Sequence, residues 1–431
     1  MHRNNKRVIL LVVVALFLVA ILAASLPPIR DRLVWHLDQW RAQALNVLFP
    51  KDEVYFVPQD QVAMIVQATL SAMAPSPTPL PSATPQPQAT PAATPTPLPA
   101  QVALTGVRYE DQHGLWNYCA PANLAMALSY WGWQGDRLDT GKVLKPYDDD
   151  LNVMPYEMAS YVEDYTQLGV VVRQGGTITL LKQLVAAGYP VLIEKGVIIK
   201  EASTGQNTWM GHYSVITGYD DAKQEFITQD SYYSPDYPIT YDEITIEWRP
   251  LNYVFLVIYP PERQANVFAL LGNYADERTS DQIAAQNAAN EVAADSGINQ
   301  FFAWFNRGTS MVSMQDYYGA ANAYDQAFVL LSSLPEDQIP KKVMRIVWYQ
   351  TGPFFAYYYT GRYQDVIDLA NTAIDLATRG PFLEESFYWR GRARAALGDT
   401  AGAIDDLQTS LKYHPDFPPS VELLSQMGVS N

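Results

Sequence analysis

An unbroken apolar run from Val8 to Leu26 opens the chain, directly after a short basic head. A run of this length without a charged residue predicts a transmembrane helix. The positive-inside rule places residues 1–7 in the cytoplasm and the rest of the chain outside it. We therefore expect a single-pass cell-membrane protein with a signal anchor over residues 1–27. The alternative is a signal peptide cleaved near the small residues 23–25, which would make the protein secreted.

Two further helices are predicted between this anchor and a proline-rich spacer. Residues 29–49 form an amphipathic pattern, and a second helix is expected over residues 59–73, so residues 28–74 are interpreted as juxtamembrane helices. The apolar residues near one side of the first helix are Leu33, Trp40, Leu45 and Leu48. Ten of the 30 prolines then lie within residues 75–100, and this composition predicts an extended linker rather than a packed core.

Beyond the linker, the first strong pattern surrounds Cys119. Apolar residues recur after it at helical spacing, at Leu124, Leu128 and Trp131, and Gly132 ends the run. The pattern predicts a helix of about a dozen residues with Cys119 at its amino end. A thiol there lies at the positive end of the helix dipole, which favours the nucleophilic thiolate form.

The pattern then changes to one typical of strands. A short helix leads into a buried strand at 190–194, and His212–Tyr219 alternate as a second strand. After a polar turn, Glu225–Asp230 form a returning strand. We expect His212 to open one strand and Asp230 to end its antiparallel partner, so that the two side chains are adjacent.

Composition excludes several classes of function. The chain has 431 residues, with 45 acidic against 29 basic side chains and a net charge of −16, so it lacks the basic surface of a nucleic-acid-binding protein. Its single cysteine, Cys119, rules out an internal disulfide and any cysteine-based zinc or iron–sulfur site. The acidic run Asp148–Asp150 is interpreted as a solvated loop rather than a calcium site. We expect neither a cofactor nor a metal.

The three chemically competent side chains form a recognisable set. A thiol at a helix start, a histidine on a strand and a carboxylate that orients the histidine are the parts needed for thiolate catalysis. Cys119, His212 and Asp230 supply them in that order along the chain. His113 is a rival imidazole close to the thiol in sequence, but it lacks the strand context.

At this point the sequence resembles the papain-like cysteine peptidases of the bacteriocin-processing, double-glycine type, over residues 101–262. The residues that carry the resemblance are Gln112, Cys119-Ala-Pro-Ala, the lead-in Ala187–Ile193, the motif Gly211–Asp220 and Asp230. The resemblance implies that Cys119 is the nucleophile, that His212 is the general base and acid, and that Asp230 orients His212. It also implies that Gln112 donates a hydrogen bond to the oxyanion.

The sequence departs from the family pattern at two places. Ala120 follows the cysteine where the family usually has glycine, and Gln112 precedes Cys119 by seven residues where six is commoner. The family's transporter-linked members cut leader peptides after two glycines on the cytoplasmic side. That substrate is not carried over, because this domain is expected to face outward without a transporter.

The remaining third of the chain becomes helical and alanine-rich. Residues 263–300 are interpreted as connecting helices, and residues 301–431 contain three copies of a pattern that resembles the tetratricopeptide repeat, starting near residues 301, 347 and 384. The residues that fit the repeat are Trp304, Gly308, Ala320, Tyr324 and Ala327 in the first copy, Gly361, Tyr363, Ala370 and Ala373 in the second, and Gly391, Gly398, Ala403, Leu407 and Pro415 in the third. Such repeats bind a peptide or partner protein, or serve only as a scaffold that packs against the peptidase domain and recognises nothing.

These patterns together predict an α+β papain-like cysteine peptidase domain plus an all-α tetratricopeptide-like helical repeat domain, behind an N-terminal transmembrane helix. The predicted function is an exported, membrane-tethered cysteine peptidase that hydrolyses a peptide or protein substrate, with the repeats binding a substrate or a protein partner. Two alternatives stay open. The domain is a catalytically silent peptide-binding module, or it is an amidase or acyl transferase that uses the same triad.

Overall fold

The computed structural model describes residues 27–48, 53–59, 97–147, 149–378 and 380–429. Among these residues, no helix combines the length and apolar character needed to cross a bilayer. The predicted membrane span and the second predicted juxtamembrane helix lie outside the described residues, as does most of the linker. The helix predicted over residues 29–49 is present as α2 (Pro27–Leu48), but Leu33, Trp40, Leu45 and Leu48 are all exposed on it.

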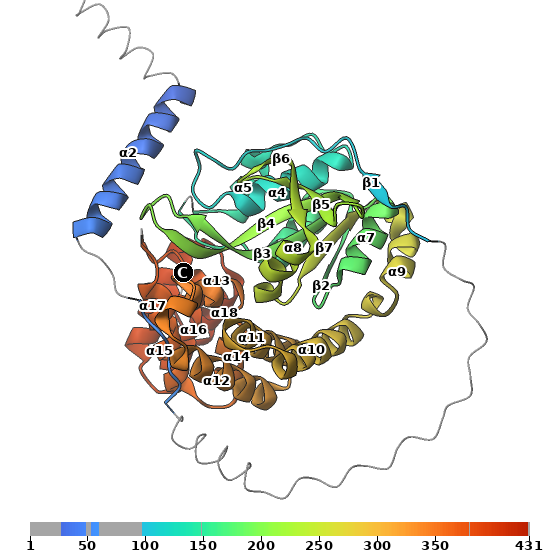
Figure 1. Ribbon diagram of the computed structural model, residues 1–431. Coiled ribbons are helices and arrows are strands. Elements are labelled where there is room, and N and C mark those ends of the chain that lie inside the picture. The colour runs from blue at the N-terminus through green and yellow to red at the C-terminus, as the bar shows by residue number, and fades with distance from the viewer. Residues whose placement is uncertain (1–26, 49–52, 60–96, 148, 379, 430–431) are drawn as a thin grey trace, which may run out of the picture.

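A seven-stranded antiparallel sheet forms the centre of the first domain (Figure 1). Its strand order is β2-β7-β3-β4-β5-β6, and β1 pairs with β4 at one end. The strands are β1 (Gln101–Ala103), β2 (Gly169–Arg173), β3 (Val191–Lys200), β4 (Asn207–Asp220), β5 (Glu225–Asp230), β6 (Ser234–Thr240) and β7 (Phe255–Tyr259).

Both faces of the sheet are covered by helices, because alternate residues of each strand point to opposite faces. Leu192 and Val215 pack in one core with α4, whereas Ile193 and Ile216 pack in the other core with α7. The helices of the first core are α4 (Cys119–Tyr130), α5 (Arg137–Leu144) and α6 (Pro155–Tyr165). Those of the second are α7 (Ile178–Ala186), α8 (Tyr241–Trp248) and α9 (Gln264–Leu271).

The predicted elements around the candidate residues are present, with two differences. The helix after Cys119 and the returning strand to Asp230 have the predicted bounds. The strand predicted to end at residue 194 runs on to Lys200 as β3, and β4 begins at Asn207, so His212 lies within a strand rather than at its start. The extension follows from pairing, because residues 195–200 and 207–212 hydrogen-bond to each other as a hairpin arm.

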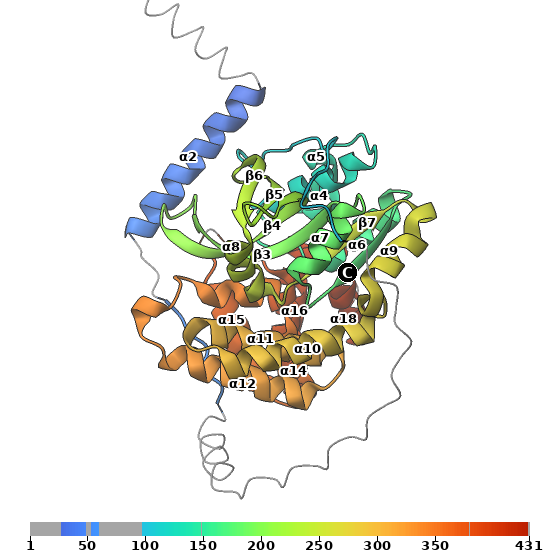
Figure 2. The ribbon, with the colours of Figure 1, turned by 45° about the vertical axis from the view of Figure 1, so that its right-hand side comes forward.

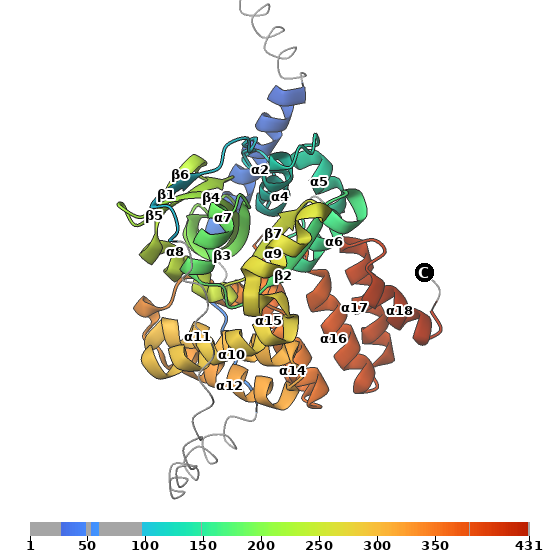
Figure 3. The ribbon, with the colours of Figure 1, turned by 90° about the vertical axis from the view of Figure 1, so that its right-hand side faces the viewer.

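The rest of the described chain is helical and lies against the sheet domain (Figures 1 and 2). Successive helices pack as neighbours, and α16, α17 and α18 lie side by side near the carboxyl end (Figure 3). The helices are α10 (Glu277–Ala294), α11 (Gly297–Ser313), α12 (Tyr317–Ser333), α13 (Ile346–Tyr349), α14 (Gly352–Tyr359), α15 (Tyr363–Asp375), α16 (Glu384–Ala396), α17 (Thr400–Tyr413) and α18 (Pro418–Gln426).

Three helical hairpins correspond to the three sequence copies. Their turns contain Gln315, Gly361 and Gly398, which have φ values of 63°, 79° and 85°. Close packing within a hairpin depends on small residues: a Cβ atom on Gly308 would lie 2.7 Å from the Tyr324 ring. The helical region is therefore confirmed, while its identity as tetratricopeptide repeats stays a prediction.

The helical region also packs around a segment that precedes the linker. Phe56, only 3% exposed, lies in its core, with ring centroids 4.9 Å from Phe328 and 5.9 Å from Tyr357. The backbone N–H of Gln59 donates to Asp365 at 3.0 Å. Residues 53–59 are thus bound by the helices of their own chain.

A buried ionic contact joins the two domains. Glu201, just after β3, accepts a hydrogen bond from Arg345 at 2.7 Å and one from Lys342 at 3.2 Å, both from the helical region. Nearby, the Tyr349 ring packs on Gly211, where a Cβ atom would lie 2.6 Å from it. Burial opposes ionisation of Glu201, but the charges of Arg345 and Lys342 lower its pKa to about 2.

The Glu201 contact predicts an acid-sensitive domain interface. Glu201→Gln leaves Arg345 buried without its counter-charge and should lower the free energy of unfolding by about 3–5 kcal/mol at pH 7. Because the folded-state pKa is depressed, this contribution is present above about pH 4.5 and is lost as the pH falls towards 2. Urea unfolding at several pH values measures it. The exposed Glu422→Gln is the matched control, and an equal effect of both substitutions would contradict the prediction.

Candidate active site

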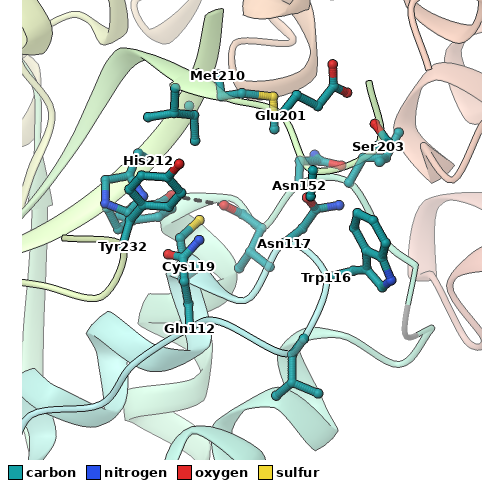
Figure 4. Close-up of a pocket in the computed structure, with 18 of the residues that line it drawn as sticks. Gln112, Trp116, Asn117, Cys119, Asn152, Glu201, Ser203, Met210, His212 and Tyr232 are labelled. Atoms are coloured by element: carbon teal, nitrogen blue, oxygen red, sulfur yellow. Dashed lines mark hydrogen bonds between the residues drawn. The ribbon is translucent and has the colours of Figure 1, made fainter. Parts of the chain in front are cut away.

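Cys119 is the first residue of α4 and is partly exposed at the bottom of a cleft (Figure 4). Pro121 occupies the first turn, where its missing N–H costs no helical hydrogen bond. Asn123, one turn further on, donates from Nδ2 to the Cys119 carbonyl oxygen at 2.8 Å. The thiol is therefore held at the helix start by both the helix and a buried amide.

His212 and Asp230 reach the cleft from adjacent strands, β4 and β5. Their side chains are 2.8 Å apart between Nε2 and Oδ1, and both residues are at most 1% exposed. Asp230 also accepts the backbone N–H of Tyr232 at 3.0 Å, which fixes its carboxylate. Since Nε2 is engaged by Asp230, Nδ1 is the ring nitrogen left for Cys119, whose thiol is in hydrogen-bonding contact with the imidazole.

The electrostatic environment favours a charged histidine. Burial alone would lower the pKa of His212, but the charge of Asp230, their hydrogen bond and the contact with Cys119 raise it to about 9. Burial likewise opposes ionisation of Asp230, yet His212 and Lys195 hold the pKa of this carboxyl well below its ordinary value. The imidazolium and the carboxylate therefore stabilise each other inside the protein.

Lys195 is a charged member of the site that the sequence analysis missed. It lies directly opposite His212 in the β3–β4 register, and its Nζ is 3.4 Å from Asp230 Oδ2 and 2.9 Å from Glu247 Oε2. The residue is only 1% exposed. Its position was hidden because the predicted strand ended at residue 194, directly before Lys195, whereas β3 runs on to Lys200.

Gln112 lies beside Cys119 in the same cleft (Figure 4). The Ser231 hydroxyl donates to Gln112 Oε1 at 2.7 Å, and Asn123 Nδ2 donates to the same hydroxyl at 2.8 Å. These contacts occupy the carbonyl end of the glutamine amide, so its Nε2 is the end available to a bound group. Ser231 and Asn123 carry no sequence motif that could have identified them.

The structure thus brings together all four residues singled out from the sequence, Gln112, Cys119, His212 and Asp230. The rival histidine, His113, is exposed, and its Nδ1 lies 2.6 Å from Asp111 Oδ1 at the cleft edge. It is therefore paired with a surface carboxylate, in contrast to the buried arrangement of His212.

The cleft extends beyond the sheet domain and encloses about 1120 Å³ including its open mouth. Trp348, Tyr349 and Thr378 of the helical region form part of its wall, and Trp35 of α2 reaches it near Trp116. Packing of the helical region against the sheet domain was one of the expected roles, but the sequence pattern predicted none of these wall residues.

Residues that could hold a metal ion lie outside the cleft lining. Among the described residues, Glu157, Glu384 and His414 form the group whose ligand atoms are close enough together for one ion. Asp150, predicted to lie in a solvated loop, is only 3% exposed and packs near this group, so that prediction was wrong for Asp150. The loop is drawn inward by its contact with the helical region, where Leu151 N donates to Phe382 O at 3.3 Å.

Comparison with known proteins concerns the sheet domain. A search of curated proteins gave no match. Two solved structures are similar. A putative C39-like peptidase from Bacillus anthracis is 18% identical, and the match covers 37% of this chain and 96% of that chain with a TM-score of 0.30. Xylellain, a cysteine protease from Xylella fastidiosa, is 16% identical, and the match covers 38% of this chain and 87% of that chain with a TM-score of 0.29. Residues 104–254 match the Peptidase_C39 like family, and the sheet domain is therefore similar to C39-like cysteine peptidases.

Proposed function

We propose that the protein is a cysteine peptidase in which Cys119, His212 and Asp230 act as a catalytic triad. The observation that carries this proposal is the position of His212, whose ring contacts Asp230 through Nε2 and Cys119 on its other side. The match of residues 104–254 to a peptidase family supports the same reaction class. The active species is a thiolate–imidazolium pair.

The chemistry follows from this arrangement. The Cys119 thiolate attacks the carbonyl carbon of a peptide bond, and the imidazolium of His212 gives its proton to the departing amine. Water then attacks the resulting thioester, with His212 taking one proton from the water, and Cys119 is released as the carboxylate product leaves. Asp230 keeps the ring oriented and stabilises its charge through both halves of the reaction.

The oxyanion of each tetrahedral intermediate needs hydrogen-bond donors. We assign this role to Gln112 Nε2 together with a backbone N–H near Cys119, because Ser231 holds the opposite end of the glutamine amide at 2.7 Å. One such donor is typically worth about 10²–10³ in rate. The separation of seven residues from Cys119 is accommodated because Gln112 is anchored just after β5, where its backbone N–H donates to Ser231 O at 3.0 Å.

The helical region belongs to the substrate site in this proposal. Trp348 and Tyr349 give the cleft an apolar wall, and an extended peptide bound across Cys119 would lie against it. Residues 53–59 illustrate the kind of segment that these helices accept elsewhere, an extended stretch with one buried aromatic side chain. The repeats therefore contribute to substrate selection.

The location outside the cell, tethered by residues 8–26, is part of the same proposal. It is supported by the character of α2, which follows the apolar run directly. Its exposed face carries Val34, Leu37 and Trp40, which are 51%, 55% and 68% exposed. Such a face suits the interface of a membrane next to the anchor.

Covalent labelling tests the catalytic role of the thiol. The full chain, purified in detergent, should react with an electrophilic thiol-peptidase probe at Cys119 faster than free cysteine does. His212→Ala should slow labelling by about 10²-fold or more, because the general base is lost. Mass spectrometry of the intact chain over time gives the rates.

Two histidine variants make the labelling test specific. His36→Ala is the matched control and should label at the wild-type rate, and His113→Ala discriminates the rival imidazole. Labelling no faster than that of free cysteine, or a rate unaffected by His212→Ala, would refute the catalytic proposal. Slower labelling of His113→Ala, with no change for His212→Ala, would assign the role of general base to His113.

The raised pKa of His212 predicts a distinctive titration. The imidazole should titrate with a midpoint near 9 in the wild type, and with Asp230→Asn the midpoint should fall, because burial then acts without the charge of the carboxylate. Imidazole NMR shifts measure both values. Since the folded-state pKa is raised, the stability from this pair is fully present below pH 6.5 and is lost as the pH rises through about 9. Equal midpoints in both proteins would contradict the assignment.

A further inference from the structure

An interdomain carboxylate cluster lies beside the cleft, and neither the proposed peptidase chemistry nor the repeats account for it. It comprises Asp150, Glu157, Glu384, Glu385 and His414. Glu157 lies on α6 of the sheet domain. In the helical region, Glu384 and Glu385 begin α16, and His414 follows the end of α17. The cluster is therefore assembled only when the helical region is docked on the sheet domain.

The members are close enough to share one ligand. One donor atom from each of Glu157, Glu384 and His414 lies within 4.8 Å of the others, and His414 Nδ1 is 3.0 Å from Glu384 Oε1. Glu384 and Glu385 are 1% and 6% exposed. Asp150, Glu384 and Glu385 are thus buried next to one another, whereas Glu157 and His414 are partly exposed.

Two buried oxygen atoms at the cluster lack a partner. Glu384 Oε2 and Asn152 Oδ1 have no hydrogen-bond donor within the described parts of the chain. Asn152 is 5% exposed, and its Nδ2 lies 3.4 Å from both oxygens of Glu385, so the amide adjoins the cluster. A proton shared between carboxyl groups would give Glu384 Oε2 a partner. Buried polar oxygens without partners are rare and costly, and a cation bound by Glu384 would satisfy its Oε2 atom.

We infer that this cluster is a binding site for one divalent metal ion, with Glu157, Glu384 and His414 as protein ligands. A mixed set of carboxylate and imidazole donors suits Zn²⁺ or Mn²⁺. The ion neutralises charge that is otherwise buried at the boundary of the two domains. Asp150 and Glu385, next to the ligands, add to the negative potential that attracts it.

The position of the ion gives it a structural role. It links α6 to α16 and to the end of α17, so its binding favours the docked arrangement of the two domains. The adjoining loop runs through Asn152, which lines the cleft and donates from Nδ2 to Trp348 O at 2.9 Å. Asn117, two residues before the thiol, donates to the carbonyl of Asp150 at 3.0 Å. Metal binding therefore also steadies one wall of the cleft.

The test is direct metal binding by the full chain, purified in detergent and stripped with a chelator. Calorimetric titration with ZnCl₂ and with MnCl₂ should give one saturable equivalent for at least one of the two metals. Glu384→Gln and Glu157→Gln should each weaken this binding by more than about 10-fold. Even residues that only hydrogen-bond to a metal ligand typically contribute about 10-fold to metal affinity. The midpoint of thermal unfolding should rise with metal concentration in the wild type and not in these variants.

The controls separate this site from general surface binding. Asp111→Asn removes the carboxylate of the exposed pair with His113 and should keep the full equivalent and its affinity. The Glu→Gln changes preserve side-chain shape, and circular dichroism verifies folding. Absence of saturable binding for both metals overturns the proposal, as does equal binding by wild type and both glutamine variants. A third outcome also contradicts the proposal. If the wild type binds no metal and Glu384→Gln raises the midpoint of thermal unfolding, protons shared between the carboxyl groups explain the cluster.

Discussion

The contact between the His212 imidazole and the Asp230 carboxylate is the interaction on which the rest of the cleft depends. A lone carboxylate in this position would be neutral, because burial penalises its charge. His212 at 2.8 Å and Lys195 at 3.4 Å keep it ionised. The ionised carboxylate in turn fixes the ring so that its other nitrogen faces Cys119. Three neighbouring strands, β3, β4 and β5, supply these groups, so the order of strands in the sheet determines the site.

Local sequence patterns were sufficient to predict the helix that carries Cys119 and the hairpin that carries His212 and Asp230. The three- and four-residue spacing after Cys119 and the stop at Gly132 defined α4, and alternation defined the hairpin to Asp230. Lys195 was missed because a glutamate–lysine pair resembles the end of a strand. In the structure, Glu194 and Lys195 are both buried within β3 and pair with Tyr213 and His212 of β4. Burial of this kind follows from neighbouring strands and cannot be deduced from one segment.

The contacts between the two domains could not be predicted residue by residue from the sequence. The helical region supplies Trp348 and Tyr349 to the cleft and Arg345 to the buried contact with Glu201. It also buries Asp150, which was predicted to be solvated because it belongs to the acidic run Asp148–Asp150. None of these contacts has a periodic signature, because each joins residues more than a hundred positions apart. The proximity of His212 and Asp230 could be predicted from the sequence, but the surroundings of these residues required the docked domains.

The contact between the two domains also shapes the cleft around the single cysteine. The sheet domain holds the thiol, the imidazole and the carboxylate, and the helical region forms part of the wall against which a substrate would lie. The carboxylate cluster lies at the same boundary. Changes at the boundary are therefore expected to reach the cleft through the loop at Asn152.

The most direct measurement of the central claim is product analysis of a defined peptide mixture incubated with the full chain, in comparison with Cys119→Ala. The account predicts that mass spectrometry detects cleaved peptides with new carboxyl and amino termini for the wild type and none for the variant. Peptides that are retained intact by both proteins would identify a binding module instead. Products joined to an added amine in place of water would identify an acyl transferase, and either result would contradict the peptidase assignment.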